Sequence, residues 1–325
     1  MEQVLIHVGM PKCGSSTLQK HVFCKLTETQ NFGLYPTNNI AGKNGASLEA
    51  NAIYLHDENL FDFYKQIHNN SSIPPDKLKS IWQSVYDENR NHHYKNLLLS
   101  HEALTAPFFS LVSQQEKATR LKSLFPDAKI LIIVRNQPGW LRSQYRDHPF
   151  LPTNLSRGKP VSFNTWINLV MHHEKLASIR ESLQYTHLIN RYAKLFGIKN
   201  IYILAFEDLA KNPILFSQAL SKFLDVTPEW INTQLYKKHE NKGLSAQYNL
   251  LRQIDRRNIK INFINCLVKK LLDIDTIKKL PQKKYKLDKT VTQTIENLYR
   301  EDNLRLSKIV GIKNHSYPGL EGSQN

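Results

Sequence analysis

The sequence has no long hydrophobic run and few cysteines. Its apolar runs are short, such as Lys129–Val134, whereas a helix that spans a membrane needs about 20 apolar residues. The cysteines, Cys13, Cys24 and Cys266, are odd in number, and their spacings match neither a zinc site nor a disulfide framework. We therefore expect a soluble protein that works in a reducing compartment.

No linker rich in Pro, Gly or Ser, no low-complexity stretch and no internal repeat divides the 325 residues. A chain of this length with 41% hydrophobic residues can bury a large core. We expect a single domain over 1–325, with an α/β core over 1–240 and a mainly helical part over 241–325. Because Val4–Val8 already has the pattern of a core strand, we expect no signal peptide or anchor and a cytoplasmic location.

Acidic residues are scarce relative to basic ones. The chain has 28 Asp and Glu against 44 Lys and Arg, a formal net charge of +16. This charge predicts an anionic partner, which could be a nucleotide, a polysaccharide, a membrane surface or a nucleic acid. Between Arg256 and Lys289, eleven basic residues face only three Asp. That segment is either an ordinary packed helix with a solvated Lys face or a surface for peripheral membrane contact or an anionic acceptor.

Four β-rich apolar runs alternate with helical patterns: Val4–Val8, Asn96–Ser100, Lys129–Val134 and Asn200–Phe206. Strands that alternate with amphipathic helices indicate a parallel sheet covered by helices on both faces. The predicted class is therefore three-layer α/β, with a central parallel sheet, a P-loop-like strand, loop and helix at the start, and a helical C-terminal region.

The segment between the first run and a helix that begins near Ser15 has the features of a phosphate-binding loop. An anion at the start of a helix meets unsatisfied backbone N–H groups and the positive end of the helix dipole. Gly9 and Gly14 have the separation of the Walker A glycines, but Ser15 stands where that motif has lysine, and the loop's one lysine is Lys12. Neither of the next two predicted strands ends in the Asp that would help to hold magnesium. A metal-free phosphate-ester site therefore fits better than a kinase or NTPase.

The sequence resembles the sulfotransferase family, whose phosphosulfate loop reads P-K-x-G-[ST]-[ST] directly after the first strand. Residues 11–16 match this motif, with Cys13 where Thr is more usual. The resemblance implies 3′-phosphoadenosine 5′-phosphosulfate (PAPS) as sulfuryl donor, adenosine 3′,5′-bisphosphate (PAP) as product, and no metal. It also implies that Lys12 acts at the oxygen that bridges phosphate and sulfate. The loop residues that it assigns to donor binding are Pro11, Lys12, Cys13, Gly14, Ser15, Ser16 and Thr17.

A second motif strengthens the resemblance, because sulfotransferases bind the 3′-phosphate with an Arg at the end of a strand and a Ser on the following helix. Arg135 follows the third run, Pro138 suits the first turn of a helix, and Ser143 comes eight residues after the Arg. A planar guanidinium can donate two parallel hydrogen bonds to a phosphate. Arg135 and Ser143 are therefore expected to bind the donor.

Two later segments also resemble the family. Lys242 and Gly243 lie in a basic, Gly-containing segment like the late loop that closes over the nucleotide, although a plain turn between helices would explain them equally well. Residues 295–306 resemble the closing helix of bacterial members.

The general base is the least defined part of the predicted site. Such a base contributes about 10²- to 10⁴-fold to the rate. Glu102 and His101 follow the second run, at the edge where open α/β sheets bind ligands, and strand alternation would send them to opposite faces. Glu102 is preferred because bacterial relatives have a similar Ser-x-Glu here. Glu49 and His56 remain alternatives, since related enzymes often place the base soon after the first helix.

The resemblance implies a hydroxyl or amine acceptor, above all a carbohydrate or glycolipid, because many bacterial relatives modify polysaccharides or glycolipids. Two other functions stay open: a divergent P-loop nucleotide kinase or NTPase, and a basic protein that binds nucleic acid or a membrane surface. The sequence contains no recognisable nucleic-acid module.

Cys13 lies near the start of a helix, where a thiol pKa is expected to be lowered.

Overall fold

A computed structural model of the chain describes residues 3–29, 32–34, 63–67, 70–89, 96–105, 112–147, 161–236 and 286–310. Within these ranges five parallel strands form one sheet, in the order β2-β3-β1-β4-β5. Their bounds are Gln3–His7 (β1), Phe32–Leu34 (β2), Asn96–Ser100 (β3), Lys129–Val134 (β4) and Ile201–Ala205 (β5). Four of them are the predicted strands. β2 was missed because three residues are too few to show a periodic pattern.

The sheet is central because its strands are apolar on both sides. In β4 the five residues after Lys129 are all buried, as expected for a strand with both faces covered. β1 lies between β3 and β4, with His7 in register with Ser100 and Leu131. The loop after β1 therefore leaves from the middle of the sheet.

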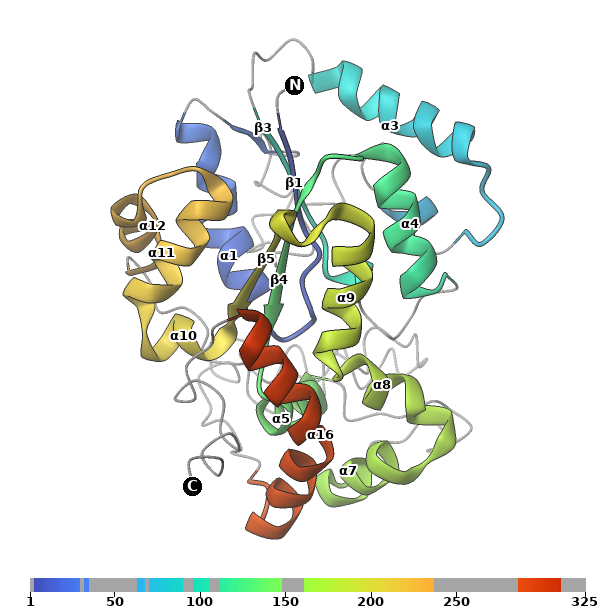
Figure 1. Ribbon diagram of the computed structural model, residues 1–325, viewed down its shortest axis with the longest axis vertical. Coiled ribbons are helices and arrows are strands. Elements are labelled where there is room, and N and C mark those ends of the chain that lie inside the picture. Colours follow the sequence, from blue (N-terminus) through green and yellow to red (C-terminus); the bar gives the residue numbers. More distant parts are fainter. Residues whose placement is uncertain are drawn as a thin grey trace, which may run out of the picture.

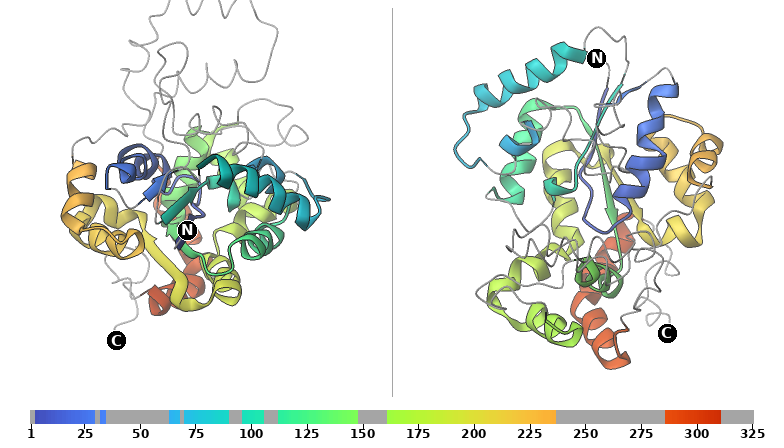
Figure 2. Two further views of the ribbon diagram at one scale, coloured as in Figure 1. Left: turned by 90° about the horizontal axis from the view of Figure 1, so that it is seen from above. Right: turned by 180° about the vertical axis from the view of Figure 1, so that it is seen from behind.

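Helices cover both faces of the sheet (Figures 1 and 2). One face carries Ser15–His21 (α1), Phe206–Lys211 (α10), Pro213–Leu224 (α11) and Pro228–Tyr236 (α12). The other carries Pro75–Asn89 (α3), Gln114–Leu124 (α4) and Tyr185–Phe196 (α9). α9 buries a stripe at helical spacing that includes Leu188, Tyr192 and Phe196. The predicted three-layer α/β class is confirmed.

A further group of helices lies beyond the carboxyl ends of the strands, in the lower part of Figure 1. It consists of Gln137–Asp147 (α5), Phe163–His172 (α7), Ala177–Ser182 (α8) and Lys289–Val310 (α16). Residues 63–67 are also helical. Short 3₁₀ helices lie at Phe23–Thr29 (η1), Glu102–Leu104 (η3), Glu174–Leu176 (η4) and Ile198–Asn200 (η5). α16 contains the predicted closing helix over 295–306. Among the described residues, no helix combines the length and the apolar character needed to cross a bilayer.

Most of the predicted C-terminal region lies outside the described residues. This applies to 241–285, which holds Lys242, Gly243 and nearly all of the basic segment from Arg256. The proposed division into a core and a helical part therefore stays a prediction.

Candidate functional site

The loop between β1 and α1 lies at the carboxyl edge of the sheet, at its centre. Lys12 and Gly14 have positive φ angles of 67° and 87°. Backbone in this left-handed region helps to turn successive N–H groups toward one point, as in anion-binding loops. Gly14 suits its position because a Cβ there would lie 3.1 Å from the Phe206 ring in a backbone conformation that side chains rarely adopt. α1 has only seven residues, so side chains around the loop must supply much of the positive charge.

Arg135 joins the end of β4 to this loop. Its Nη1 donates a hydrogen bond of 2.6 Å to the carbonyl oxygen of Lys12, 123 residues away. Its guanidinium lies over the Phe206 ring, 4.2 Å from the centroid, and its Nε is buried with no partner among the described residues. Burial lowers the pKa of Arg135, an effect that Glu207 opposes. The structure thus brings two predicted site residues, Lys12 and Arg135, into direct contact.

α5 also contacts the loop. Asn136 precedes the helix, and its Oδ1 accepts a hydrogen bond of 2.8 Å from the Gly139 N–H, which caps the helix. One turn further, Trp140 Nε1 donates to the Pro11 carbonyl oxygen at 2.7 Å. Ser143 follows on the same helix and is buried. The helix that carries Ser143 is therefore fixed to the phosphate-type loop through Pro11.

Glu207 supports the Arg135 segment and was missed by the sequence analysis. Its Oε1 accepts hydrogen bonds from the Asn136 backbone N–H, at 3.0 Å, and from Asn136 Nδ2. Burial raises the pKa of Glu207, and the bonds from Asn136 and the charge of Arg135 oppose that shift. The Tyr185 hydroxyl donates to the Arg135 carbonyl oxygen at 2.6 Å. The acidic pair after β5 was the one signal in the sequence that could have pointed to Glu207.

Three buried polar side chains lie behind the loop and were also missed. His7 Nδ1 lies 2.8 Å from Ser100 Oγ, and Gln19 Nε2 donates to the same hydroxyl at 2.9 Å. Beside them, Thr105 Oγ1 donates to the Gly9 carbonyl oxygen at 2.7 Å. These contacts connect α1 and the segment after β3 to the loop.

The two candidate bases differ in their surroundings. β3 ends at Ser100 and Glu102 begins η3, so strand alternation does not set the directions of His101 and Glu102. The His101 ring stacks on Tyr64 with centroids 4.4 Å apart. Glu102 is half-buried, and its charge lies close enough to the loop to help raise the pKa of Cys13.

The remaining predicted residues divide into two groups. Ser15 is buried, Thr17 half-buried and Ser16 exposed at the start of α1. Four others lie outside the described residues: Glu49, His56, Lys242 and Gly243.

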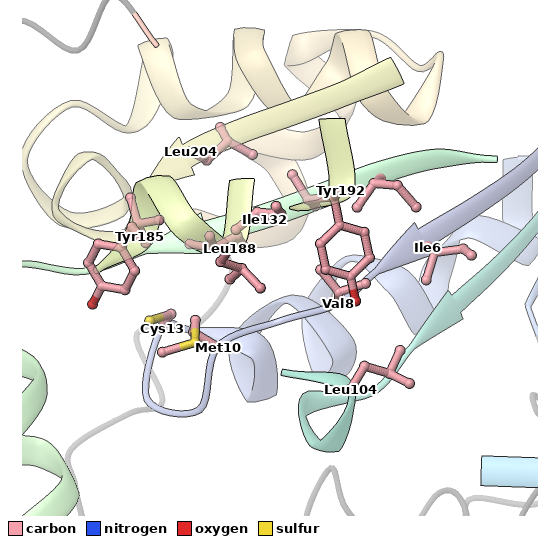
Figure 3. Packing of buried hydrophobic residues seen from close by; sticks show 14 of the residues in the cluster. Ile6, Val8, Met10, Cys13, Leu104, Ile132, Tyr185, Leu188, Tyr192 and Leu204 are labelled. Atoms are coloured by element: carbon pink, nitrogen blue, oxygen red, sulfur yellow. The ribbon is translucent and has the colours of Figure 1, made fainter. Parts of the chain in front are cut away.

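Cys13 does not have the expected environment. Its side chain is 1% exposed, and in Figure 3 it lies beside Met10 and faces Tyr185 and Leu188 of α9. Burial raises the pKa of the Cys13 thiol well above its usual value, and Arg135 only partly opposes this. The expectation of a lowered thiol pKa was therefore wrong, because the side chain points into the core and only the backbone belongs to the loop.

Metal-binding clusters are not found in the part of the chain that the structure describes, where no three His, Cys, Asp or Glu side chains gather.

Comparison with protein families identifies the chain. A family model for the sulfotransferase domain matches residues 2–301. The chain belongs to the sulfotransferase family. The resemblance carried by the loop and by Arg135 is thus confirmed at the level of the family, and the protein is a sulfotransferase enzyme.

The fold of this sulfotransferase is similar to that of a solved relative, a sulfotransferase from Alicyclobacillus acidocaldarius. The two structures superpose with a TM-score of 0.50 and 15% sequence identity, over 96% of this chain and 97% of the other. At this identity the likeness concerns the fold alone. No curated protein sequence matches the chain.

Proposed function

We propose that this sulfotransferase transfers the sulfuryl group of PAPS to a hydroxyl or amine group of a carbohydrate or glycolipid, releases PAP, and uses no metal. The observation that carries the proposal is the hydrogen bond from Arg135 to the carbonyl oxygen of Lys12. It brings the residue expected at the 3′-phosphate next to the residue expected at the transferred group.

The loop supports binding of the phosphosulfate end of the donor. Ser15 Oγ is buried and has no partner among the described residues, so it can donate its proton to an anion. Buried polar groups normally have a hydrogen-bond partner, and one that lacks it often marks a functional position. Lys12 adds a positive charge at the same loop, and Gly14 leaves the space and the backbone conformation that a close anion needs.

The 3′-phosphate end is supported by Arg135 and Ser143. Nε of Arg135 is buried without a partner in the described chain, and a guanidinium with an unused N–H suits a phosphate oxygen. Tyr185 and Lys12 hold the arginine backbone and Nη1 respectively. A preformed arginine loses little conformational entropy when the nucleotide binds.

The chemistry follows from these positions. The acceptor oxygen or nitrogen forms a bond to sulfur while the bond from sulfur to the 5′-phosphate oxygen breaks, and PAP leaves. Glu102 takes the acceptor proton, and the Lys12 ammonium offsets the negative charge that develops on the leaving phosphate. His101 is the weaker candidate base because its ring is stacked on Tyr64.

The acceptor class is supported by the acceptors that many bacterial relatives use and by the charge of +16, which suits an anionic glycan. A cytoplasmic location is part of the proposal, since Cys13 and Cys24 form no disulfide among the described residues.

Calorimetric titration with PAP in the absence of magnesium tests the donor. We expect wild-type protein to bind PAP, and Arg135→Ala to weaken binding about 100-fold because a charge-assisted contact is lost. Arg142→Ala is the matched control, since Arg142 is exposed on α5, the helix that follows Arg135, and it should bind as the wild type does. Binding of ATP with magnesium, and not of PAP, would overturn the proposal in favour of a kinase or NTPase.

Turnover tests the base and the acceptor. Release of PAP from PAPS is measured with a panel of neutral glycans, anionic glycans and glycolipids. Glu102→Gln should lower kcat by about 10²-fold or more while PAP binding stays unchanged. An unchanged kcat would exclude Glu102 as the base.

A further inference from the structure

A chain of hydrogen bonds lies behind the phosphate-type loop. Gln19 of α1 donates to Ser100 Oγ of β3 at 2.9 Å, and Ser100 Oγ lies 2.8 Å from His7 Nδ1 of β1. All three side chains are buried. His7 and Ser100 are paired in the strand register, so the sheet itself sets the contact between them.

The direction of these hydrogen bonds can be assigned. Gln19 Nε2 also lies 3.4 Å from the Ser100 carbonyl oxygen, which orients the amide with its nitrogen toward Ser100. The Ser100 hydroxyl therefore accepts from Gln19 and has its own proton left to donate, and His7 Nδ1 is the acceptor that faces it. An imidazole that accepts at Nδ1 carries its proton on Nε2.

The His7 ring is neutral under ordinary conditions. Burial lowers the pKa of His7 to about 3, and no charged group contributes to this shift. The ring therefore presents one N–H donor, Nε2–H, on the side away from Ser100.

That donor points to the start of the loop. A Cβ added at Gly9 would lie 3.0 Å from His7 Nε2 and 2.8 Å from Ser15 Oγ. Each of these two atoms is buried and has no hydrogen-bond partner among the described residues. Two unpaired buried polar atoms thus face the same point, and only a glycine at position 9 leaves that point open.

We propose that His7 is a positioning residue of the donor site. In the structure, His7 Nε2 and Ser15 Oγ face the same point without a hydrogen bond between them; when the donor binds, the Nε2–H donates to Ser15 Oγ and so leaves the Ser15 proton for the 5′-phosphosulfate oxygen. This inference rests on the proposed function, because it assigns a device to the same site. The hydrogen bonds then all run in one direction: Gln19 donates to Ser100, Ser100 to His7, His7 to Ser15, and Ser15 to the anion. His7 touches no substrate atom and acts through Ser15.

Two substitutions of His7 separate its hydrogen bond from its packing. His7→Phe keeps an aromatic ring against Phe23, whose centroid is 5.3 Å away, but removes both ring nitrogens. His7→Gln keeps an amide that can donate toward Ser15. Tyr192→Phe is the control, since it alters another buried aromatic side chain whose hydroxyl has no partner in the described chain.

Affinities for PAP and for adenosine 3′-monophosphate, which lacks the 5′-phosphate, form the readout. We expect His7→Phe to weaken PAP binding about tenfold, the factor for one hydrogen bond to a charged group, and to leave adenosine 3′-monophosphate binding unchanged. His7→Gln should recover part of the loss, and Tyr192→Phe should change neither affinity. Equal losses for both nucleotides, or no loss for PAP, would overturn the inference.

The tautomer provides a test that does not depend on the nucleotide. Nitrogen NMR of the wild-type protein labelled at histidine should show the His7 proton on Nε2. A separate binding measurement uses Ser100→Ala, which removes the hydroxyl that fixes this tautomer. This variant should weaken PAP binding by less than His7→Phe does. A proton on Nδ1 would overturn the inference even if PAP binds. Failure of the wild type to bind PAP would instead overturn the proposed function, and with it the ligand assigned to Ser15.

Discussion

Cys13 shows that the position of a residue in a motif does not determine the environment of its side chain. Its backbone belongs to the loop that begins α1, but its thiol is buried against α9. Position near the start of a helix favours a thiolate, whereas burial in apolar surroundings disfavours it. Burial is the larger effect here and raises the thiol pKa.

Cys13 is therefore expected to react slowly with thiol reagents. In a variant with Cys24→Ser and Cys266→Ser, Cys13 is the one thiol left. Its labelling rate in the native protein should be far below that of a free cysteine, because burial raises the thiol pKa and also shields the sulfur from the reagent. Denaturant should restore the rate. Rapid labelling of the native protein would contradict this burial.

His7 should make the protein sensitive to acid. Its pKa is about 3 in the folded state and about 6.5 in the unfolded chain, so below pH 6.5 the unfolded chain binds a proton that the folded protein does not. Stability from this source is complete above pH 6.5 and falls by about 1.4 kcal/mol per pH unit on acidification toward pH 3.

Denaturant unfolding at pH 7 and pH 5 measures this effect. The wild type should lose about 2 kcal/mol more of its free energy of unfolding between these values than His7→Phe does. Equal losses in the two proteins would mean that His7 is not neutral in the folded state.

Sequence analysis found candidate residues of the site where they follow an apolar run or where a family motif marks them, as for Ser143. Lys12 and Arg135 come directly after apolar runs, which mark them as ligand-binding candidates. His7 lies inside such a run and could not be told from a core residue. The role of His7 depends on its strand register with Ser100, 93 residues away. The role of Glu207 depends on its hydrogen bond from Asn136, 71 residues away.

At the scale of elements, α16 stabilises the two helices that lie next to Arg135, α5 and α9. Gln137 at the start of α5 and Asn303 of α16 exchange two amide hydrogen bonds, of 2.8 Å and 3.1 Å. The neighbouring Asp302 accepts hydrogen bonds from Thr186 at the start of α9. The C-terminal helix thereby fixes the starts of both helices that flank Arg135.

Asn303→Leu should lower the free energy of unfolding by about 1–3 kcal/mol, because the buried Gln137 amide loses both of its hydrogen bonds with Asn303 and keeps, within the described chain, only that to the Leu183 carbonyl oxygen. Adding Gln137→Leu should restore much of that loss, since replacing both partners by apolar groups of similar size can be nearly neutral. A double-mutant cycle measured in denaturant gives the coupling. Additive losses would show that the two amides stabilise the fold independently.

The strands could be predicted where the apolar run in the sequence is at least five residues long. The runs that became β1, β3, β4 and β5 carry a strong apolar signal, while β2 has three residues and no readable period. The helix predicted from Ser15 ends at His21 and continues as η1. Leu18, Val22 and Leu26 are nevertheless all buried, because helices of both kinds place residues three or four apart on one side.

At the scale of the whole molecule, the site is assembled where the carboxyl ends of β1, β3, β4 and β5 meet. Each strand contributes the residues that follow it, and long-range hydrogen bonds join these segments, such as that from the Arg135 guanidinium to the Lys12 carbonyl oxygen. The relative from Alicyclobacillus acidocaldarius shares this fold over 96% of the chain at 15% identity. Topology can thus persist while most side chains change, which is why function must be argued from the site.

The net charge of the chain should affect how quickly the proposed product nucleotide, PAP, associates with it. PAP is strongly anionic, and a formal charge of +16 attracts it over distances that salt screens, since the Debye length falls from about 10 Å at 0.1 M to about 3 Å at 1 M. The dissociation rate depends instead on short contacts in the loop and at Arg135, which salt weakens less.

Stopped-flow binding at low and high ionic strength separates the two contributions. Between about 0.05 M and 0.5 M potassium chloride we expect the association rate for PAP to fall about tenfold or more and the dissociation rate to change less than threefold. Adenosine 3′-monophosphate, which carries less charge, should show a smaller dependence. A constant association rate together with a rising dissociation rate would mean that the basic residues act only through direct contact with the bound nucleotide, and that the overall charge serves another partner.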